Sequence, residues 1–143
     1  MTRIDFYILP QTTLDARLEF ACRLAETIHR KGYRLHVHTE DETMGRDFDD
    51  RLWNFRFDAF VPHHLLGEAG DHPAPVTIGW QDTPEPGIEA LLNLHPEIPP
   101  WFSRFERVAE IINQHQGILH AKRECWQTYK SRGYQVEAHH LEG

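Results

Sequence analysis

The sequence has little of what marks a secreted or membrane-spanning protein. It contains only two cysteines, Cys22 and Cys125. Each falls on the apolar side of a helical pattern, which predicts buried thiols in a reducing compartment, although a disulfide between them stays open. No apolar run approaches the roughly 18 residues that a membrane span needs. The opening MTRIDFYILPQTT has an acid inside a short apolar run and no small-residue cleavage site. We therefore expect a cytoplasmic protein.

Positive charge is also scarce. The chain has 15 Lys and Arg against 22 Asp and Glu, a formal net charge of −7. Because neutralising phosphates takes clustered cations, this balance argues against broad electrostatic capture of DNA or RNA. We expect any link to nucleic acid to pass through another protein.

What the chain does contain is the composition and patterning of one α/β domain over residues 1–143, with 40% hydrophobic residues and no repeats. An apolar strand pattern at 4–9 is followed by a helix that Thr12 caps and Gly32 ends, and then by a strand at 34–38. This opening predicts a parallel crossover unit. Further elements are expected as follows: a helix at 41–54, strands at 76–80, 88–94 and 105–113, a helix at 117–132 and a strand at 134–140. We predict a three-layer fold with a mostly parallel sheet.

The turn after the first strand, LPQTTLD, has no glycine. Neither a GxGxxG nor a GxxxxGK[ST] loop is therefore present to bring backbone N–H groups against a phosphate. The fold is expected to be mononucleotide-binding-like without a phosphate loop, and we predict no cofactor.

Eleven histidines raise the hypothesis of a metal site. His36 and His38 share one side of a strand, and two adjacent pairs stand at 63–64 and 139–140, but no HExxH or CxxC motif accompanies them. We predict surface or packing histidines and no metal. No GxSxG motif is present and neither cysteine has a local basic partner, so we assign no catalytic residue, while a constellation of distant residues stays open.

The last helix has two distinct stripes, taking about 100° per residue. The predicted core stripe is Ile118, Ala121, Cys125, Thr128 and Tyr129. The second stripe is Leu119, Arg123, Trp126 and Lys130. In one interpretation Trp126 tucks under a neighbouring loop, with the cations reaching water. In the other, the stripe is a docking site for an acidic peptide with a hydrophobic end.

The stretch LWNFRFDAFVPHHLLGE, residues 52–68, is unusually apolar for an irregular segment. It could be a loop anchored in the core through Phe60 and Val61. However, a short segment cannot turn all of its large side chains inward, and exposed apolar clusters of this size mark protein interfaces. The residues expected to include exposed ones are Trp53, Phe55, Phe57, Leu65 and Leu66.

Several of these segments resemble one family. FYIL at the start, LW followed by FVPHHLLGE, then APVTIGW and RECWQTYKSRGYQ are similar in order and spacing to the chi subunit of bacterial DNA polymerase III. The resemblance implies a non-enzymatic accessory protein of the clamp-loader complex. It implies two partners: a small subunit, psi, and the acidic, phenylalanine-ended tail of single-stranded DNA-binding protein (SSB).

The resemblance also implies a tail-binding site. Arg123 matches a basic position of the family, Trp126 an aromatic one and Ile112 an apolar one that lines the pocket. Gln127 stands where a family lysine can sit, and Leu119 where another basic residue can.

We expect Lys122 and Lys130 to compensate for these missing charges. The psi site is expected, on physical grounds, in the apolar stretch from Trp53 to Leu66. Two alternatives remain: a nucleotide- or metal-dependent enzyme of the mononucleotide-fold type, and a structural homo-oligomer that buries this stretch.

Overall fold

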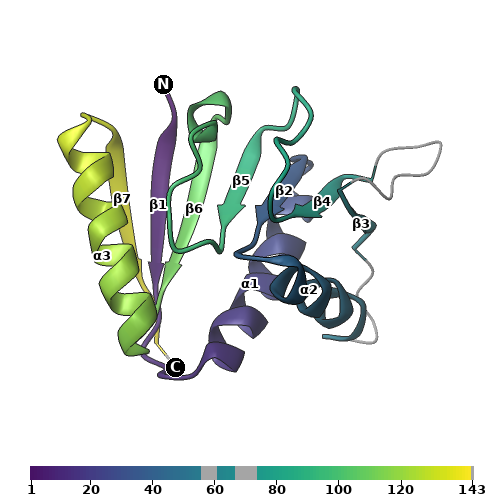
Figure 1. The fold of residues 1–143 in the computed structure, drawn as a ribbon, viewed down its shortest axis with the longest axis horizontal. Helices are drawn as coiled ribbons and strands as arrows, with labels where there is room; N and C mark the ends of the chain where they lie inside the picture. Colours follow the sequence, from purple (N-terminus) through teal and green to yellow (C-terminus); the bar gives the residue numbers. More distant parts are fainter. Residues whose placement is uncertain (56–60, 67–73, 143) are drawn as a thin grey trace.

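A computed structural model describes residues 1–55, 61–66 and 74–142. Within these residues seven strands form one sheet, in the order β3-β4-β2-β5-β6-β1-β7 (Figure 1). The elements in chain order are β1 (Arg3–Ile8), α1 (Leu14–Arg30), β2 (Leu35–His38), α2 (Glu42–Asn54), β3 (His63–Leu65), β4 (Val76–Gly79), β5 (Ala90–Asn93), the 3₁₀ helix η1 (Phe102–Arg104), β6 (Arg107–Ile112), α3 (Gln116–Ser131) and β7 (Gln135–His140). Every pair of neighbouring strands is parallel, which confirms the predicted α/β architecture.

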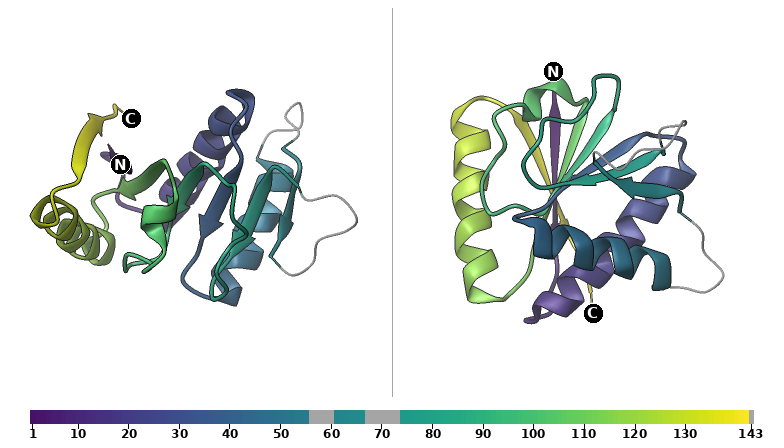
Figure 2. Two further views of the ribbon diagram at one scale, coloured as in Figure 1. Left: turned by 90° about the horizontal axis from the view of Figure 1, so that it is seen from above. Right: turned by 45° about the vertical axis from the view of Figure 1, so that its right-hand side comes forward.

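Helices cover both faces of the sheet, giving the three predicted layers (Figure 2). α1 and α2 pack on one face, against a core that includes Leu35 and Val37 of β2. α3 and η1 pack on the other face, where Tyr129 meets Phe6 and Val108. Because successive residues of a strand point to opposite faces, the central strands supply both cores and are buried almost throughout.

The ends of the helices follow local sequence signals. Thr13 Oγ1 accepts a hydrogen bond from the backbone N–H of Ala16 at 3.1 Å, so the N-cap lies one residue after the predicted Thr12. Gly32 and Gly133 follow α1 and α3 with φ of 88° and 85°, a conformation that glycine adopts without strain. Both predicted stops are thereby confirmed. No helix in the described part of the chain has the length and apolar character needed to cross a bilayer.

The segment after α2 contains a strand that the sequence did not predict. β3 follows Pro62 and pairs with β4 at the edge of the sheet. Three residues are too few to show the alternation of buried and exposed positions by which a strand is recognised. Residues 56–60 and 67–73 lie outside the described residues, and with them Phe57 and Phe60.

Candidate functional site

A groove of about 520 Å³ runs beside α3, where this helix packs on the strands at the β7 end of the sheet. The groove is lined by Phe6, Ile8, Ile112, Gln114, Leu119, Lys122, Arg123, Trp126, Ala138 and His140. Ile112, Arg123 and Trp126, which the family pattern assigned to one pocket, therefore lie on one concave surface.

Trp126 forms a partly buried wall of this groove. Its ring packs edge-on against Phe6 of β1, with the ring centroids 5.0 Å apart and an interplanar angle of 63°. Lys130 Nζ lies 5.9 Å from the indole centroid, within the range of a cation–π contact. The indole thus rests on the sheet rather than under a loop, and α3 supplies a cation beside it.

Arg123 supplies the exposed positive charge of the groove. Its guanidinium has no ion-pair partner among the described residues, so its donors are available to a ligand carboxylate. The same side chain lines a shallower neighbouring depression together with Glu124 and Gln127. The uncharged Gln127 therefore lies beside Arg123, at the position where the family pattern can have a lysine.

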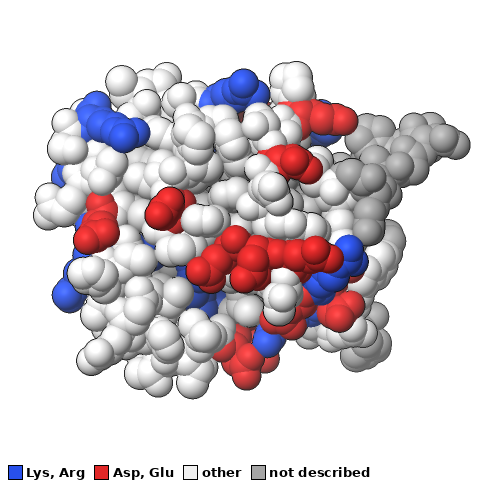
Figure 3. Space-filling view, viewed as in Figure 1, with Lys and Arg blue, Asp and Glu red and all other residues white. Residues whose placement is uncertain are grey.

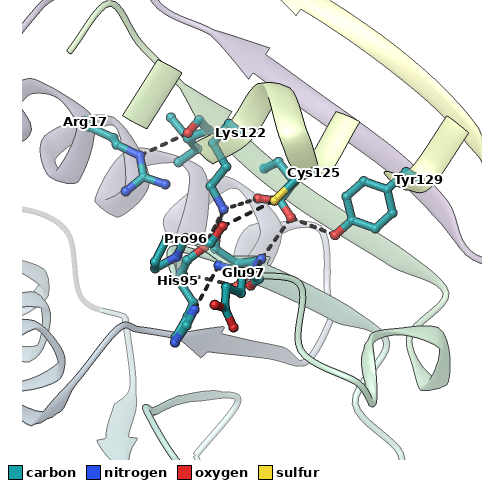
Figure 4. A network of polar contacts seen from close by, with 10 residues as sticks. Arg17, His95, Pro96, Glu97, Lys122, Cys125 and Tyr129 are labelled. Carbon is teal, nitrogen blue, oxygen red and sulfur yellow. Dashed lines mark hydrogen bonds and ion pairs between the residues drawn. The ribbon is translucent and has the colours of Figure 1, made fainter. Parts of the chain in front are cut away.

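Lys122 does not contribute the surface charge that the sequence predicted. Its ammonium is fully buried and lies 2.6 Å from Glu110 Oε1, and it also donates to the backbone carbonyls of Asn93 and His95 (Figure 4). The side chain of Lys122 is buried because this position of α3 faces the sheet, where the ends of β5 and β6 surround the ammonium. Compensation for the missing family charges can come from Lys130 but not from this ammonium.

The carboxylate of Glu110 organises this network. Its Oε2 accepts hydrogen bonds from Tyr129 Oη at 2.7 Å and from Asn93 Nδ2 at 2.9 Å. Burial, followed by the neighbouring Glu110 charge, raises the pKa of Tyr129, so the phenol stays a donor. α3 is thereby fixed in rotation about its axis, which holds Arg123 and Trp126 at the groove.

The inward face of α3 differs from the predicted core stripe. Lys122, Cys125 and Tyr129 are its buried residues, whereas Ile118 and Ala121 are only partly buried. The helix is therefore turned toward its lysine, because that lysine has a carboxylate partner in the sheet.

The two cysteines are free and buried, as predicted. Burial raises the pKa of Cys22 to about 12 and that of Cys125 to about 11. Both thiols are therefore protonated and poorly nucleophilic at neutral pH.

The apolar stretch assigned to psi divides into exposed and buried parts. Trp53, at the end of α2, is 49% exposed. Phe55 and Leu66 are partly buried. Leu65 is only 3% exposed because it belongs to β3 and packs in the core, so it does not contribute to an exposed surface, whereas Trp53 meets the expectation that the set includes exposed residues. Phe57 lies outside the described residues.

Charge is unevenly distributed over the face seen in Figure 3. Asp and Glu gather in a band over the region of α2, with some Lys and Arg beside it, whereas charges of both signs are scattered over the region of α3. An acidic ligand would therefore meet less repulsion at α3 than at α2.

His36 and His38 pack inside the protein. Both are buried on β2, with ring centroids 5.8 and 5.0 Å from that of Trp101. Burial lowers the pKa of His36 to about 3 and that of His38 to about 4, with smaller effects from neighbouring histidines and, for His38, from Lys122. These two are packing histidines, one of the two roles predicted.

Among the residues that the structure describes, one group of side chains could hold a metal ion. Asp5, Glu137 and His139 place one ligand atom each within 4.8 Å of one another. However, Asp5 Oδ2 already accepts from Arg107 Nη2 at 2.8 Å, and Asp5 Oδ1 lies 3.0 Å from His139 Nε2. The sequence could not reveal this group, because only the parallel pairing of β1 with β7 brings its members together.

Comparisons with known proteins agree with one another. Residues 1–137 match the model of the family described as DNA polymerase III chi subunit, HolC. The chain is 40% identical to DNA polymerase III subunit chi of Pseudomonas aeruginosa over 141 residues, covering 99% of this chain and 98% of that protein. It is 28% identical to DNA polymerase III subunit chi of Escherichia coli, covering 95% of this chain and 96% of that protein.

The fold itself is more widely shared. The crystal structure of T4 UvsW matches with a TM-score of 0.70 at 10% identity, over 99% of this chain and 42% of that chain. That likeness concerns the fold alone, whereas the family match and the 40% identity concern the sequence. The chain therefore belongs to the family of DNA polymerase III chi subunits.

Proposed function

We propose that this chain is a non-catalytic adaptor that links the clamp-loader complex of DNA polymerase III, through psi, to the C-terminal tail of SSB. Membership of the chi family gives it a role in DNA replication as a subunit of that polymerase. The observation that carries the proposal is the groove in which Ile112, Arg123 and Trp126 meet.

The groove has the chemistry that an acidic, phenylalanine-ended tail requires. Arg123 offers a planar set of donors to the terminal carboxylate. Trp126 and Ile112 offer apolar walls to the phenyl ring. Lys130, held over the indole, adds positive charge for the acidic residues of the tail.

The surface around Trp53 is the proposed contact with psi. A tryptophan that is half exposed at the end of a helix, with Phe55 and Leu66 partly buried, is the kind of anchor that protein interfaces use. We further propose that the protein is cytoplasmic, consists of a single domain and reaches DNA only through these partners. We assign it no catalytic residue and no cofactor.

Calorimetry with a synthetic SSB tail peptide tests this function. We expect saturable binding of the peptide with a free terminal carboxylate, and much weaker binding of the same peptide as a C-terminal amide, because the amide removes the charge that Arg123 recognises. Equal affinity for both peptides, or no binding of either, would contradict the adaptor function.

The rival enzyme hypothesis is tested separately. Because the turn between β1 and α1 has no glycine-rich loop, titration with ATP and magnesium should give no saturable heat. Nucleotide hydrolysis that stays with the protein through purification would favour the enzyme.

A further inference from the structure

A second cleft, of about 530 Å³, lies at the carboxyl ends of the central strands. β1 and β6 are neighbours in the sheet, but the chain passes from β1 to α1 on one face and from β6 to α3 on the other. In parallel α/β sheets, ligands bind in the crevice where the connections diverge in this way. The first turns of α1, α2 and α3 all line the cleft.

Arg17, from the first turn of α1, is an incompletely satisfied cation in this cleft. Its side chain is 2% exposed, and its Nε donates to the carbonyl of Ile111 at 3.0 Å. Its Nη2 has no hydrogen-bond partner in the described part of the chain. Burial lowers the pKa of Arg17 to about 10, so the group is still charged at neutral pH. A buried donor without an acceptor is costly, and an anion in the cleft would remove that cost.

The start of α3 adds to the positive side of the cleft. Its N-cap residue, His115, makes no side-chain capping hydrogen bond, and the first turn carries no acid. The first N–H groups of α3 are therefore not capped by a side chain, in contrast to those of α1 and α2. His115 Nδ1 is also buried without a partner among the described residues.

The cleft is also lined by acidic and by apolar side chains. Glu40 and Asp41, at the start of α2, line the cleft. Glu40 is exposed, and its carboxylate has no ion-pair partner among the residues described. Leu94, Ile118 and Ala121 supply the apolar wall. A ligand that fits must therefore carry both charges on an apolar body.

We propose that this cleft binds a small zwitterion of the α-amino-acid class with an apolar side chain. The carboxylate lies toward Arg17 and the first N–H groups of α3. The ammonium lies toward Glu40, and the side chain packs against Leu94 and Ile118. Nucleoside triphosphates do not fit this pattern, because their charge would meet the acidic side chains. The site is distinct from the proposed psi and SSB contacts, and the buried Lys122 is shared between its lining and that of the α3 groove.

Three matched probes test the proposal by NMR titration of the full chain. L-leucine carries both charges, 4-methylpentanoate lacks the ammonium, and 3-methylbutylamine lacks the carboxylate. We expect saturable shifts of the Leu94 and Ile118 methyl signals with L-leucine, and affinities at least about tenfold lower for the other two, since each loses one charged contact. Equal affinities for the three probes, or no saturable shift with L-leucine, would overturn the proposal.

Variants place the ligand in the cleft. Ala121→Leu fills the apolar wall and should abolish L-leucine binding, and Glu40→Gln should weaken it about fivefold by removing the charge opposite the ammonium. Arg17→Met should abolish it as well. If that variant does not fold, the exposed Glu40→Gln and the wall variant still decide the outcome. Arg123→Ala, in the other groove, is the matched control and should bind L-leucine normally. Unchanged binding by both Glu40→Gln and Ala121→Leu would remove the ligand from this cleft.

Discussion

Lys122 Nζ lies 2.6 Å from Glu110 Oε1, and neither side chain has any solvent exposure. The pair joins α3 to β6 from inside the molecule, while the next residue along the helix, Arg123, is exposed. Replacing such a pair by apolar residues can be nearly neutral, whereas removing one partner leaves a buried charge uncompensated. The pair therefore holds the groove in shape more than it adds net stability.

The first prediction concerns this pair. Lys122→Met should lower the free energy of unfolding by about 3–5 kcal/mol, because the Glu110 carboxylate stays buried without its cation. The double variant Lys122→Met/Glu110→Leu should lose less unfolding free energy than the single variant Lys122→Met. Urea denaturation at neutral pH measures both, and Lys130→Met on the exposed side of α3 is the matched control. A double variant that is less stable than Lys122→Met would contradict the prediction.

The second prediction concerns tail binding. Arg123→Ala should weaken binding of the SSB tail peptide by roughly 1.5–3 kcal/mol, the range for losing a charge-assisted hydrogen bond. Lys130→Ala should weaken binding by under about 1 kcal/mol, as expected for a solvent-exposed pair between a lysine and an acidic residue of the tail. Gln127→Lys should tighten the complex by restoring a charge beside Arg123. Affinity should also fall as salt rises.

Calorimetry decides these outcomes, with Arg132→Ala as the control, since that exposed residue at the end of α3 does not line the groove. Equal affinities for the wild type and Arg123→Ala would remove this helix face from the site.

The third prediction separates an interface residue from a core residue. Trp53→Glu should leave cooperative unfolding intact and abolish co-purification with psi, because the indole is half exposed. Leu65→Glu should unfold the chain instead, because it buries a charge in the core beside β4. Co-purification of the Trp53→Glu variant with psi at wild-type yield would place the psi contact elsewhere.

The fourth prediction is a loss of stability in acid. His36 and His38 are held neutral in the folded state, with pKa values of about 3 and about 4, below the ordinary value of 6.5. The unfolded chain therefore binds more protons, so the stability is fully present above pH 6.5 and is lost as the pH falls toward these values. Each histidine should contribute a slope of up to about 1.4 kcal/mol per pH unit.

Urea denaturation across this pH range measures the slope. His38→Phe should flatten it, whereas the same change at the exposed His120 should not. A slope unaffected by His38→Phe would mean that other groups govern the acid sensitivity.

Much of the fold was predictable because its signals are local. The α1 and α3 stops at Gly32 and Gly133 and the central strands each depend on residues close in sequence. β3 could not be predicted, because it is three residues long, follows Pro62 and takes its strand conformation from pairing with β4.

The groove was only partly predictable, for a related reason. Helical spacing brought Arg123 and Trp126 together correctly. The same spacing placed Lys122 between Ile118 and Cys125, inside the apolar stripe, but a lysine was taken for a surface residue. The missed signal was Glu110, an acid within the apolar strand VAEII, whose charge requires a buried partner.

The two proposed contact surfaces lie at opposite ends of one sheet, with Trp53 against His63 of β3 and the groove of α3 beside β7. Seven strands give six spacings, on the order of 30 Å in all. Two partners held at these ends do not compete for space. Tension between them would act across the strands, along the direction of the interstrand hydrogen bonds. The mechanical strength of the connection would then depend on the ladders of the sheet as much as on either contact.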